Sequence, residues 1–321
     1  MQNLLPSSEQ HPQLNVAVGL IVRNGQVLIA WRDSSQHQGG RYEFSGGKVD
    51  AEESVLVALA RELAEELAIQ VQTCRFVRRL TYRYPEKAVC LHVYRVDQFS
   101  GEPQGAEGQP IKWVAPSDLW NYQFPDANRP ILRAAQLPDL YRISHDVSAF
   151  TDLAAWLTYH VQAVAANAWL YVRVPTLDVD AQAVLIQQLQ QQRPDLKLVA
   201  QAALYDLNLP VAGYHLRQAD LLSFSSVPRL DERQLWFAAV HDAQSIQAAD
   251  ALGVDAMVLG AVLPTASHPE QAGIGWDRFQ KLAGLANCPV YALGGQSPAT
   301  LNLAQQYAGY GVAGIRGLLL S

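Results

Sequence analysis

Three glutamates lie at a spacing that suits the binding of a hard divalent cation. Glu62, Glu65 and Glu66 stand at positions i, i+3 and i+4, so on a helix they share an arc of about 100°. No lysine or arginine follows any of them by four residues, so their mutual repulsion requires another cation. Carboxylate oxygens grouped in this way favour Mg²⁺, with Mn²⁺ as the alternative, and both ions also bind substrate phosphates.

These glutamates belong to a longer string of residues. The string is Gly47-x5-Glu53-x7-Arg61-Glu62-x2-Glu65-Glu66, and beside it lies an apolar stripe of Leu56, Leu59, Leu63 and Leu67. The stripe predicts that a helix at residues 51–67 packs on a sheet. An isolated Glu-Glu pair would favour a simpler interpretation, a solvated acidic helix face. The whole string has a chance probability of about 10⁻⁵ in a chain of ordinary composition, so we favour the metal site.

Two regions with different patterns must position these residues. Residues 15–120 favour strands, namely 16–22 and 27–30 joined by an Asn24-Gly25 hairpin turn, then 76–84, 88–99 and 111–114. From residue 141 onward, short apolar strands alternate with helices. The expected strands are 141–144, 170–174, 196–200, 213–216, 236–240, 256–259, 290–293 and 311–315, and the expected helices are 181–192, 245–252, 276–285 and 298–307. Eight such units predict a parallel (β/α)₈ TIM barrel with trimmed helices, within an α/β protein.

Length, composition and charge set further limits. The chain has 321 residues, 49% hydrophobic and 17% charged, which excludes a disordered protein and predicts two domains. We place the domains at residues 1–135 and 140–321, because Pro138 interrupts the helical tail between them. The net charge of −6 excludes a protein that binds a nucleic-acid polymer along its backbone, whereas a metal ion can still neutralise a single nucleotide.

The sequence carries no pattern for secretion or for a membrane. No apolar run reaches the roughly 18 residues of a membrane helix, and the first 13 residues lack a signal pattern and predict an unstructured lead. Cys74, Cys90 and Cys288 are too few and too scattered for a disulfide framework or a cysteine zinc site. We therefore expect a cytoplasmic protein whose partner is a small-molecule nucleotide.

The string around the glutamates resembles the box of the Nudix hydrolases, which cleave nucleoside diphosphates linked to another moiety. Similar stretches at residues 17–19, 43–48, 101–103, 107–110 and 124–130 point to the MutT-type branch, which hydrolyses 8-oxo-dGTP to the monophosphate. The resemblance implies a Nudix α/β/α sandwich with a mixed sheet. Ala68 stands where the family usually has a glycine, which affects the helix end and not the ligands.

The same resemblance implies a nucleotide pocket. Its lining would be Arg32, His37, Glu43, Phe44, Ser45 and Gly46, with Ser45 in place of the family's usual proline. The side-chain amide of Asn128 would read the oxidised purine, because an amide offers a donor and an acceptor together. Simpler interpretations stay open, since Asn128 could cap a turn, His37 could be solvated and Phe44 could belong to the core.

The cleavage of a pyrophosphate bond requires metal ligands and a base, and these are the roles that we expect the acidic residues to have. Metal ions must neutralise its negative charge, orient an attacking water and stabilise the leaving oxygen. The expected metal ligands are Glu62, Glu65 and Glu66, to which the resemblance adds the Gly46 carbonyl and Glu107. Either Glu53 or Glu107 is the candidate base or a further ligand, and Arg61 orients glutamates through a bidentate contact.

A second resemblance covers the barrel region. Residues 241–246, 253–265 and 293–295 are similar to the thiamine phosphate synthase and TenI family. Glycines after the last two strands suggest a phosphate niche, with His241, Thr265, Gly294 and Gly295 as candidate ligand residues. These glycines could equally form plain tight turns, and a lone histidine at a strand end is more often structural.

The barrel region departs from that family where charge matters. Gln201-Ala202 replaces the family's Asn-Asp after the third strand, which removes an acidic Mg²⁺ ligand, and Pro175 lies near an expected lysine. Asp206 or Asp220 could substitute for the lost acid. Three hypotheses follow: a Mg²⁺-dependent 8-oxo-dGTP diphosphatase with a degenerate barrel, a bifunctional enzyme whose barrel makes or rearranges thiamine precursors, or a barrel that binds a phosphorylated ligand or braces the Nudix domain.

Overall fold

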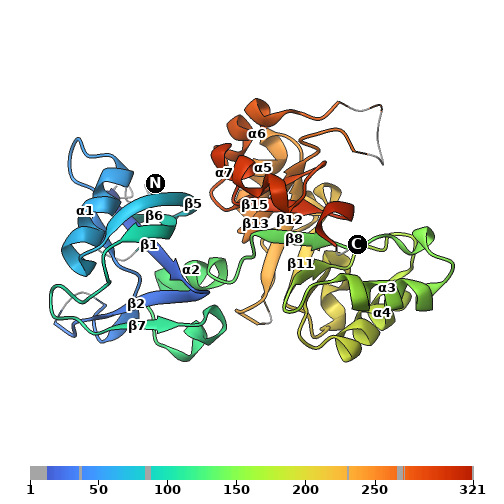
Figure 1. The fold of residues 1–321 in the computed structure, drawn as a ribbon, viewed down its shortest axis with the longest axis horizontal. Coiled ribbons are helices and arrows are strands. Elements are labelled where there is room, and N and C mark those ends of the chain that lie inside the picture. The colour runs from blue at the N-terminus through green and yellow to red at the C-terminus, as the bar shows by residue number, and fades with distance from the viewer. Residues whose placement is uncertain are drawn as a thin grey trace, which may run out of the picture. The chain divides into compact units, whose positions relative to one another are not determined.

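The chain forms two compact units. In the computed structural model, residues 1–135 form the first unit and residues 136–321 the second (Figure 1). The structure describes residues 13–35, 38–83, 88–229, 231–265, 270 and 272–319, so the lead expected at the N-terminus lies outside the described residues except for Gln13. No helix in this described part has the length and apolar character needed to cross a membrane.

A mixed sheet forms the first unit. Its strands are β1 (Gln13–Arg23), β2 (Gln26–Arg32), β3 (Arg41–Glu43), β4 (Gly46–Lys48), β5 (Gln70–Arg83), β6 (Ala88–Ser100) and β7 (Ile111–Val114). They lie in the order β3-β2-β1-β6-β5, with β4 paired to β1 and β7 to β2. The pair β1–β6 is parallel, whereas β1–β2 and β5–β6 are antiparallel. The predicted hairpin is confirmed, because Asn24 and Gly25 have the positive φ values of 53° and 75° that its turn requires.

The acidic helix α1 spans Val55–Leu67 and packs against β1, β4 and β5. It begins later than predicted, because Ser54 caps it by accepting a hydrogen bond from the Val57 amide at 3.3 Å. The stripe was wrong at Leu56, which is 50% exposed, because Ala58 faces the sheet in that turn instead. Ala68 ends the helix in the left-handed region at φ 56°, a conformation that costs glycine less than alanine.

Side chains from both faces of the sheet are buried. Ala17 and Ile21 on β1 pack with the leucines of α1, and Leu20 on the opposite face of the strand is also fully buried. Short helical segments follow β7, namely η1 (Pro116–Asn121), η2 (Asp126–Asn128) and α2 (Arg129–Ala134), and α2 contacts β5. The predicted α/β unit with a mixed sheet is confirmed.

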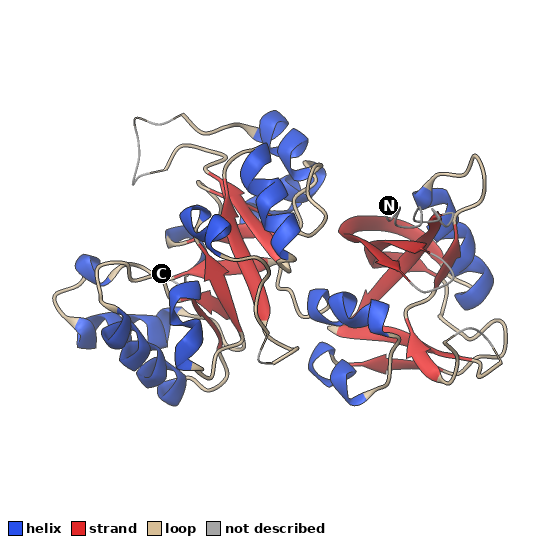
Figure 2. Ribbon diagram, turned by 180° about the vertical axis from the view of Figure 1, so that it is seen from behind, coloured by secondary structure: helices blue, strands red, loops and turns tan. Residues whose placement is uncertain are grey.

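A closed barrel of parallel strands forms the second unit (Figure 2). The strands are β8 (Leu140–Ile143), β9 (Trp169–Tyr171), β10 (Lys197–Gln201), β11 (Gly213–Leu216), β12 (Leu235–Val240), β13 (Ala256–Gly260), β14 (Val290–Leu293) and β15 (Gly311–Gly314). Each pairs with the next, and β15 closes on β8, so the predicted TIM barrel is confirmed.

The helices around the barrel are trimmed, as predicted. They are α3 (Leu153–Ala163), α4 (Val179–Gln192), α5 (Ala243–Leu252), α6 (Trp276–Ala283) and α7 (Leu301–Gln306), with short turns η3 (Val147–Ala149), η6 (Pro298–Thr300) and η7 (Arg316–Leu318). The connections after β10 and β11 hold only the 3₁₀ turns η4 (Ala202–Leu207) and η5 (Gln218–Ser223). These short connections explain how a complete barrel fits into so few residues.

Aromatic side chains fill the inside of the barrel. The ring centroids of Tyr141 and Phe237 are 4.4 Å apart, and His215 stacks on Tyr171 at 4.3 Å with planes 7° apart. The Tyr141 hydroxyl and His215 Nδ1 are hydrogen-bonded at 3.0 Å. Burial, and then the charge of Arg173, lower the pKa of His215 to about 3, so this ring is neutral at pH 7.

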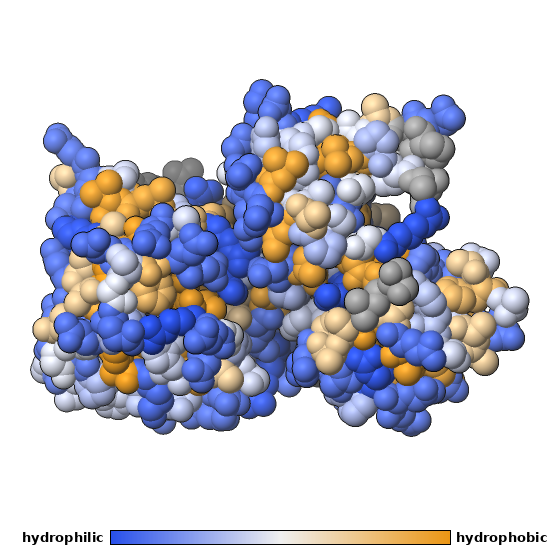
Figure 3. Space-filling view, viewed as in Figure 1, coloured by the Kyte–Doolittle hydropathy of each residue, from blue (hydrophilic) through white to orange (hydrophobic). Residues whose placement is uncertain are grey.

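The surface shows apolar side chains distributed among polar ones (Figure 3). Leu222, in η5, is 86% exposed. Single exposed apolar side chains are common on folded proteins, because polar atoms alone do not suffice to cover the surface. These side chains therefore do not by themselves indicate a partner.

A buried histidine in the barrel unit has both ring nitrogens occupied. His160 is fully buried in α3, and its Nδ1 donates to the Trp156 carbonyl at 2.8 Å. Its Nε2 accepts a hydrogen bond from the backbone amide of His145 at 3.2 Å. Burial, and to a lesser degree the nearby His145, lower the pKa of His160 to about 4. A second ring proton would break the bond from His145, so the neutral form is the folded form.

We expect His160 to make the barrel unit acid-sensitive. Its folded pKa lies below the ordinary value of 6.5, so the unfolded chain binds the proton first and stability falls as the pH drops from about 6.5 to about 4. The loss amounts to about 3 kcal/mol at the acid end. Thermal unfolding of wild type and His160→Gln between pH 7 and pH 4.5 measures it. The variant should be less stable at pH 7 and show a flatter pH dependence, and an equally steep slope would contradict the assignment.

Candidate active site

The guanidinium of Arg61 lies among the carboxylates of the string. Its Nε and Nη2 donate to the two oxygens of Glu53, each at 3.0 Å, which is the bidentate contact that the sequence predicted for this arginine. Its Nη1 donates to Glu62 at 2.9 Å and to Glu65 at 3.3 Å. Its Nη2 also donates to the Lys48 carbonyl at 3.1 Å, which ties the helix to β4. No lysine or arginine follows these glutamates by four residues, so the positive charge beside them comes from Arg61, which precedes them in the chain.

Glu66 occupies a different environment on the same helix. One of its oxygens accepts a hydrogen bond from the Gly46 amide at 3.1 Å. The pKa of Glu66 is raised to about 7 by burial, and to a lesser degree by the charges of Glu43, Glu62 and Glu107, against the opposing effect of the Gly46 amide. Carboxylates from β3, from α1 and from the segment after β6 are therefore crowded around one half-buried glutamate.

Two glycines let β4 pass between β1 and the acidic helix. Gly46 has φ 145°, and a Cβ there would clash with the Ala17 carbonyl oxygen. A Cβ on Gly47 would clash with the Glu62 carboxylate. The first glycine of the string thus serves close approach, because any side chain would push the Glu62 carboxylate away. The amide of Gly46 holds Glu66, and the metal-binding role of its carbonyl stays a prediction.

The segment at residues 101–110 is fastened to the end of α1. The amide of Ala106 and the side-chain amide of Gln109 both donate to the Glu66 carbonyl at 2.9 Å. Gln109 Oε1 accepts from the Glu107 backbone amide at 2.9 Å, so one side chain holds both glutamates. Gln109 is not among the site residues predicted from the sequence. The available signal was the set of carbonyls that every helix end leaves without donors.

Two residues of the expected nucleotide pocket, Arg32 and Glu43, lie next to these acids. Arg32 on β2 donates to Glu43 on β3 at 2.7 Å. Burial raises the pKa of Glu43 more than its pairing with Arg32 lowers it. Phe44 is 4% exposed and stacks on Phe124 with ring centroids 5.2 Å apart, so the core interpretation describes it. Ser45 is 5% exposed, and its carbonyl accepts from the Gly19 amide at 2.9 Å.

Asn128 and His37 are the two remaining residues expected in the nucleotide pocket. Asn128 is half-buried at the start of α2, and its side chain makes no capping hydrogen bond to that helix. The side chain of Asn128 therefore does not cap α2, and its contact with the purine stays a prediction. His37 lies outside the described residues.

The candidate ligand residues of the barrel lie where its last strands end. His241 Nδ1 donates to the Gly260 carbonyl at 2.8 Å, which fixes the ring against β13. Gly294 and Gly295 have φ values of 98° and 67°. A Cβ on Gly294 would lie 2.7 Å from the Cβ of Ala261, so this turn packs closely on the preceding loop. The tight-turn interpretation accounts for both glycines, and among the described residues no contact of Thr265 points to a ligand.

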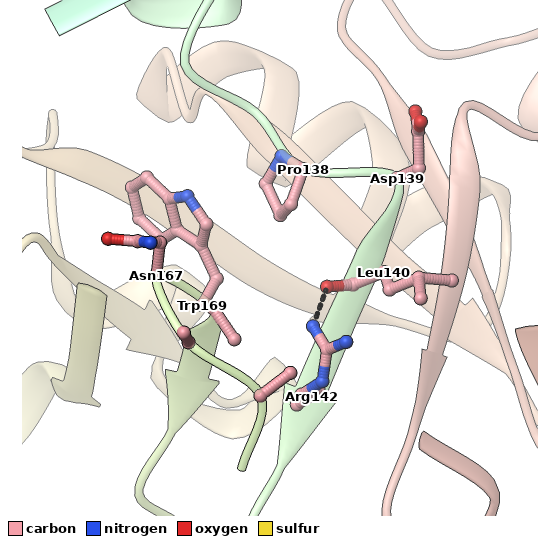
Figure 4. Close-up of a pocket in the computed structure, with 9 residues that line it drawn as sticks. Pro138, Asp139, Leu140, Arg142, Asn167 and Trp169 are labelled. Carbon is pink, nitrogen blue, oxygen red and sulfur yellow. Dashed lines mark hydrogen bonds between the residues drawn. The ribbon is translucent and has the colours of Figure 1, made fainter. Parts of the chain in front are cut away.

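A cavity of about 250 Å³ opens at the other end of the barrel, where β8 and β9 begin (Figure 4). Its lining is Pro138, Asp139, Leu140, Arg142 and residues 165–169. The Arg142 guanidinium donates to the carbonyls of Leu318 at 3.0 Å and Leu140 at 3.4 Å. Barrel enzymes place their chemistry at the carboxyl ends of the strands, so this cavity is not the expected site.

Comparison with known families decides what the two units are. The NUDIX domain matches residues 17–134, and the family described as thiamine monophosphate synthase matches residues 141–318. The chain joins a member of the NUDIX family to a member of the thiamine monophosphate synthase family. The Nudix unit contains the glutamate string, and the barrel unit contains the candidates around His241.

Relatives of the Nudix unit are hydrolases of small nucleotides. The 8-oxo-dGTP diphosphatase of Escherichia coli (strain K12) is 36% identical over 121 residues, which are 37% of this chain and 94% of that protein. The 8-oxo-dGTP diphosphatase of Haemophilus influenzae is 40% identical over 37% of this chain and 88% of its own. The CTP pyrophosphohydrolase of Escherichia coli is 35% identical over 38% and 90%. The unit is therefore a Nudix hydrolase.

Solved structures match each unit separately. A MutT structure from work on Aliivibrio salmonicida and Vibrio cholerae is 33% identical, with a TM-score of 0.34, and the match covers 39% of this chain and 97% of that one. Thiamine phosphate pyrophosphorylase from Pyrococcus furiosus is 18% identical, with a TM-score of 0.41, over 55% of this chain and 85% of that one.

Nudix hydrolases typically use a divalent metal, and the donors of this unit fit one. Among the described residues, no three acidic, histidine or cysteine side chains form a ready-made metal cage. The donors nevertheless have the required chemistry, because hard carboxylate oxygens surround Glu66 and their charges add to the effect of burial in raising its pKa to about 7. A divalent cation would remove that repulsion. Glu62, Glu66 and Glu107 are the residues that would hold it.

We expect Gly47→Ala to weaken metal binding without unfolding the Nudix unit. The added Cβ would clash with the Glu62 carboxylate and displace it. Disturbing the support of a ligand typically reduces metal affinity by about 10- to 100-fold. Titration with Mn²⁺, followed by electron paramagnetic resonance, measures the change. Gly284→Ala is the control, because a Cβ there meets no atom closer than 3.4 Å. Equal Mn²⁺ affinity in the two variants would contradict the role of Gly47.

Proposed function

We propose that the Nudix unit hydrolyses 8-oxo-dGTP and related nucleoside triphosphates to the monophosphate and pyrophosphate, with Mg²⁺ as its cofactor. The observation that carries this proposal is the crowding of Glu43, Glu62 and Glu107 around Glu66, next to the Arg32–Glu43 pair of the expected nucleotide pocket. Removal of an oxidised nucleotide from the free pool prevents its incorporation into DNA. Such a substrate would place the protein in the cytoplasm.

Some residues of the site would bind the metal ion, and others keep those metal ligands in position. A bound Mg²⁺ would neutralise the phosphates and lower the pKa of a water molecule. Glu62, Glu65, Glu66, Glu107 and the Gly46 carbonyl are the groups that would hold it. Arg61 keeps Glu53 and Glu62 at fixed positions on either side of its guanidinium. Gln109 holds the backbone of Glu107 beside that of Glu66.

The pairing of Arg61 separates the two candidate bases. Glu53 gives both oxygens to Arg61, and this pairing lowers the pKa of Glu53 below its ordinary value. A carboxylate held in this way is a poor proton acceptor. Glu107 is exposed, and its side-chain oxygens have no such partner in the described part of the chain. We therefore give Glu53 a positioning role through Arg61 in place of the base, and keep Glu107 as a further metal ligand.

Asn128 is proposed to select the base. Its amide can donate and accept at once, and it is not used as a helix cap. An oxidised guanine differs from guanine in its donors and acceptors, which a single amide can distinguish. The alternative is a pyrimidine substrate, because the CTP pyrophosphohydrolase is almost as similar to this chain as the 8-oxo-dGTP diphosphatase. Pyrophosphate release from 8-oxo-dGTP, dGTP and CTP, each with and without Mg²⁺, distinguishes the two.

We expect Glu66→Gln to lower kcat for 8-oxo-dGTP by about 10²–10³-fold, since one negative ligand is lost. The metal-free variant should melt at the same temperature as wild type or higher, because a repelled charge is removed. Glu102→Gln is the matched control, since within the described residues Glu102 pairs only with Arg23, at the surface. Turnover at the wild-type rate in Glu66→Gln would overturn the metal assignment.

Asn128→Ala should reduce the preference for 8-oxo-dGTP over dGTP by about tenfold or more, because a hydrogen-bonding group inside the pocket is lost. The ratio of kcat/KM for the two nucleotides measures it. Asn121→Ala, at an exposed position in η1, serves as the control. An unchanged ratio would mean that other residues read the base.

We propose that the barrel forms a separate domain at residues 140–321 and has lost the catalytic activity of its family. The alternative is a bifunctional enzyme whose barrel acts on thiamine precursors. Ala202 is buried at the position where an acidic Mg²⁺ ligand was expected, and Pro175 lies near the expected lysine. Each such loss costs about 10²–10³ in rate. The full chain should therefore form no measurable thiamine phosphate from the two precursors and Mg²⁺. Robust formation would favour the bifunctional enzyme.

A further inference from the structure

A half-buried arginine lines the cavity at the amino end of the barrel strands (Figure 4). Arg142 lies on β8, between Leu170 of β9 and Gly314 of β15 in the register of the sheet. Tyr141, the residue before it, stacks on another ring inside the barrel, so the side chain of Arg142 projects from the outer face of the strand. Within the described residues, β15 is followed only by the short turn η7, where a barrel of this kind usually has a helix.

The hydrogen bonds of Arg142 use only part of its guanidinium. Its Nε donates to the Leu318 carbonyl at 3.0 Å, and its Nη1 donates to the Leu140 carbonyl at 3.4 Å. Its Nη2 makes no hydrogen bond within the described part of the chain. The two carbonyls fix the plane of the group, so Nη2 and the second hydrogen of Nη1 remain as donors for another molecule.

No carboxylate among the described residues balances the charge of Arg142. Burial lowers the pKa of Arg142, and no acid of the described chain opposes that effect. Asp139, three residues earlier, points its carboxyl group away from Arg142 (Figure 4). Asp195, which accepts from the backbone amide of Asn167, is already paired with Arg193 through two bonds of 2.8 Å. A guanidinium keeps its charge at pH 7, so the cavity carries an unbalanced positive charge.

Apolar groups and one amide form the remaining lining. Pro138, the alanines among residues 165–168 and the buried Trp169 supply the apolar part. Asn167 supplies the amide, and its side chain makes no hydrogen bond within the described residues. Asn167 and Trp169 lie on one side of the cavity and Arg142 on the other (Figure 4). A molecule between them would meet a cation, a neutral donor and apolar walls.

We propose that this cavity binds a small organic monocarboxylate, whose carboxylate contacts Arg142 and whose apolar body lies between Trp169 and Pro138. A planar carboxylate matches the donors that the guanidinium has left, and the side-chain amide of Asn167 can donate to the same group. The site lies at the end of the barrel opposite to the carboxyl ends of its strands. The inference therefore depends neither on the reaction of the Nudix unit nor on any activity of the barrel.

The charge and the size of the cavity favour a small monocarboxylate over other anions. A single guanidinium balances one negative charge, whereas a phosphate monoester carries about −1.5 to −2 at pH 7 and would lose more hydration beside apolar walls. The volume of about 250 Å³ is below the range of about 300–1,000 Å³ that is typical of pockets for drug-sized ligands. The apolar body therefore has the size of a single ring or a short branched chain.

The test uses benzoate as the probe and the full chain labelled with ¹⁵N-tryptophan, observed by nuclear magnetic resonance. Benzoate should shift the signals of Trp169, which Trp169→Phe identifies, with a dissociation constant of about 1 mM. Benzamide has the same shape without the charge and should bind at least tenfold more weakly, because the contact with Arg142 is lost. Inorganic phosphate should leave the Trp169 signals unchanged at the same concentration.

Variants of the cavity separate the charge of Arg142 from its support of the fold. Arg142→Gln should weaken benzoate binding by about 10- to 100-fold, and Arg142→Lys should retain part of the affinity, because it keeps the charge and loses the planar donors. Arg278→Gln, at an exposed position on α6, is the control and should leave the affinity unchanged. Ala166→Phe should also weaken binding, because Ala166 is exposed at the rim of the cavity and a ring there would narrow it without removing any bond of Arg142.

Several outcomes would overturn the proposal. Equal affinity for benzoate and benzamide would show that no cation is involved, and equal affinity in Arg142→Gln and Arg278→Gln would exclude Arg142. Benzoate that shifts other tryptophans and not Trp169 would place the binding elsewhere. Tighter binding of phosphate than of benzoate would identify a different kind of anion site. If Arg142→Gln fails to fold, undiminished binding in Ala166→Phe decides against the cavity.

Discussion

Repulsion between carboxylates is the constraint on which the Nudix unit depends. Burial raises the pKa of Glu66, and the charges of Glu43, Glu62 and Glu107, which come from three separate segments, add to that rise and bring it to about 7. Left alone, such a group would separate or take up protons. The rest of the unit prevents this. The glycines of β4 let that strand lie directly against the Glu62 carboxylate, and Arg61 links three glutamates. Gln109 ties the segment after β6 to the end of the helix. The fold preserves a charge distribution that a divalent cation completes.

The parts of the site that follow from helical geometry could be predicted from the sequence. A spacing of i, i+3 and i+4 fixes which side chains share a face, whatever packs around the helix. Leu56 shows the limit of this reasoning. It fits the apolar stripe by spacing, yet half of its side chain is exposed because the helix begins only at Val55 and the sheet meets Ala58. Gln109 could not be predicted either, because its role depends on two backbone groups far apart in the sequence.

The barrel could be predicted because short apolar strands alternate with helices or turns eight times along this part of the sequence. What the repeats could not reveal is how side chains pair at the strand ends. Asp220 was a candidate replacement for a lost metal ligand, and only the structure shows that Arg217, three residues earlier, takes both of its oxygens. Likewise His215 was an ordinary strand residue in the sequence. Its contact with Tyr141, on a strand 74 residues away, requires the closed barrel.

The two units manage the same problem of negative charge in opposite ways. In the Nudix unit, Arg61 neutralises Glu53, Glu62 and Glu65 only in part, and Glu66 keeps a raised pKa that a metal ion can relieve. In the barrel unit, both oxygens of Asp220 are paired with Arg217 within the chain. A buried or crowded carboxylate needs a cation in either case. The Nudix unit can obtain that cation from solution as a metal ion, whereas in the barrel unit the guanidinium of Arg217 already supplies it to Asp220.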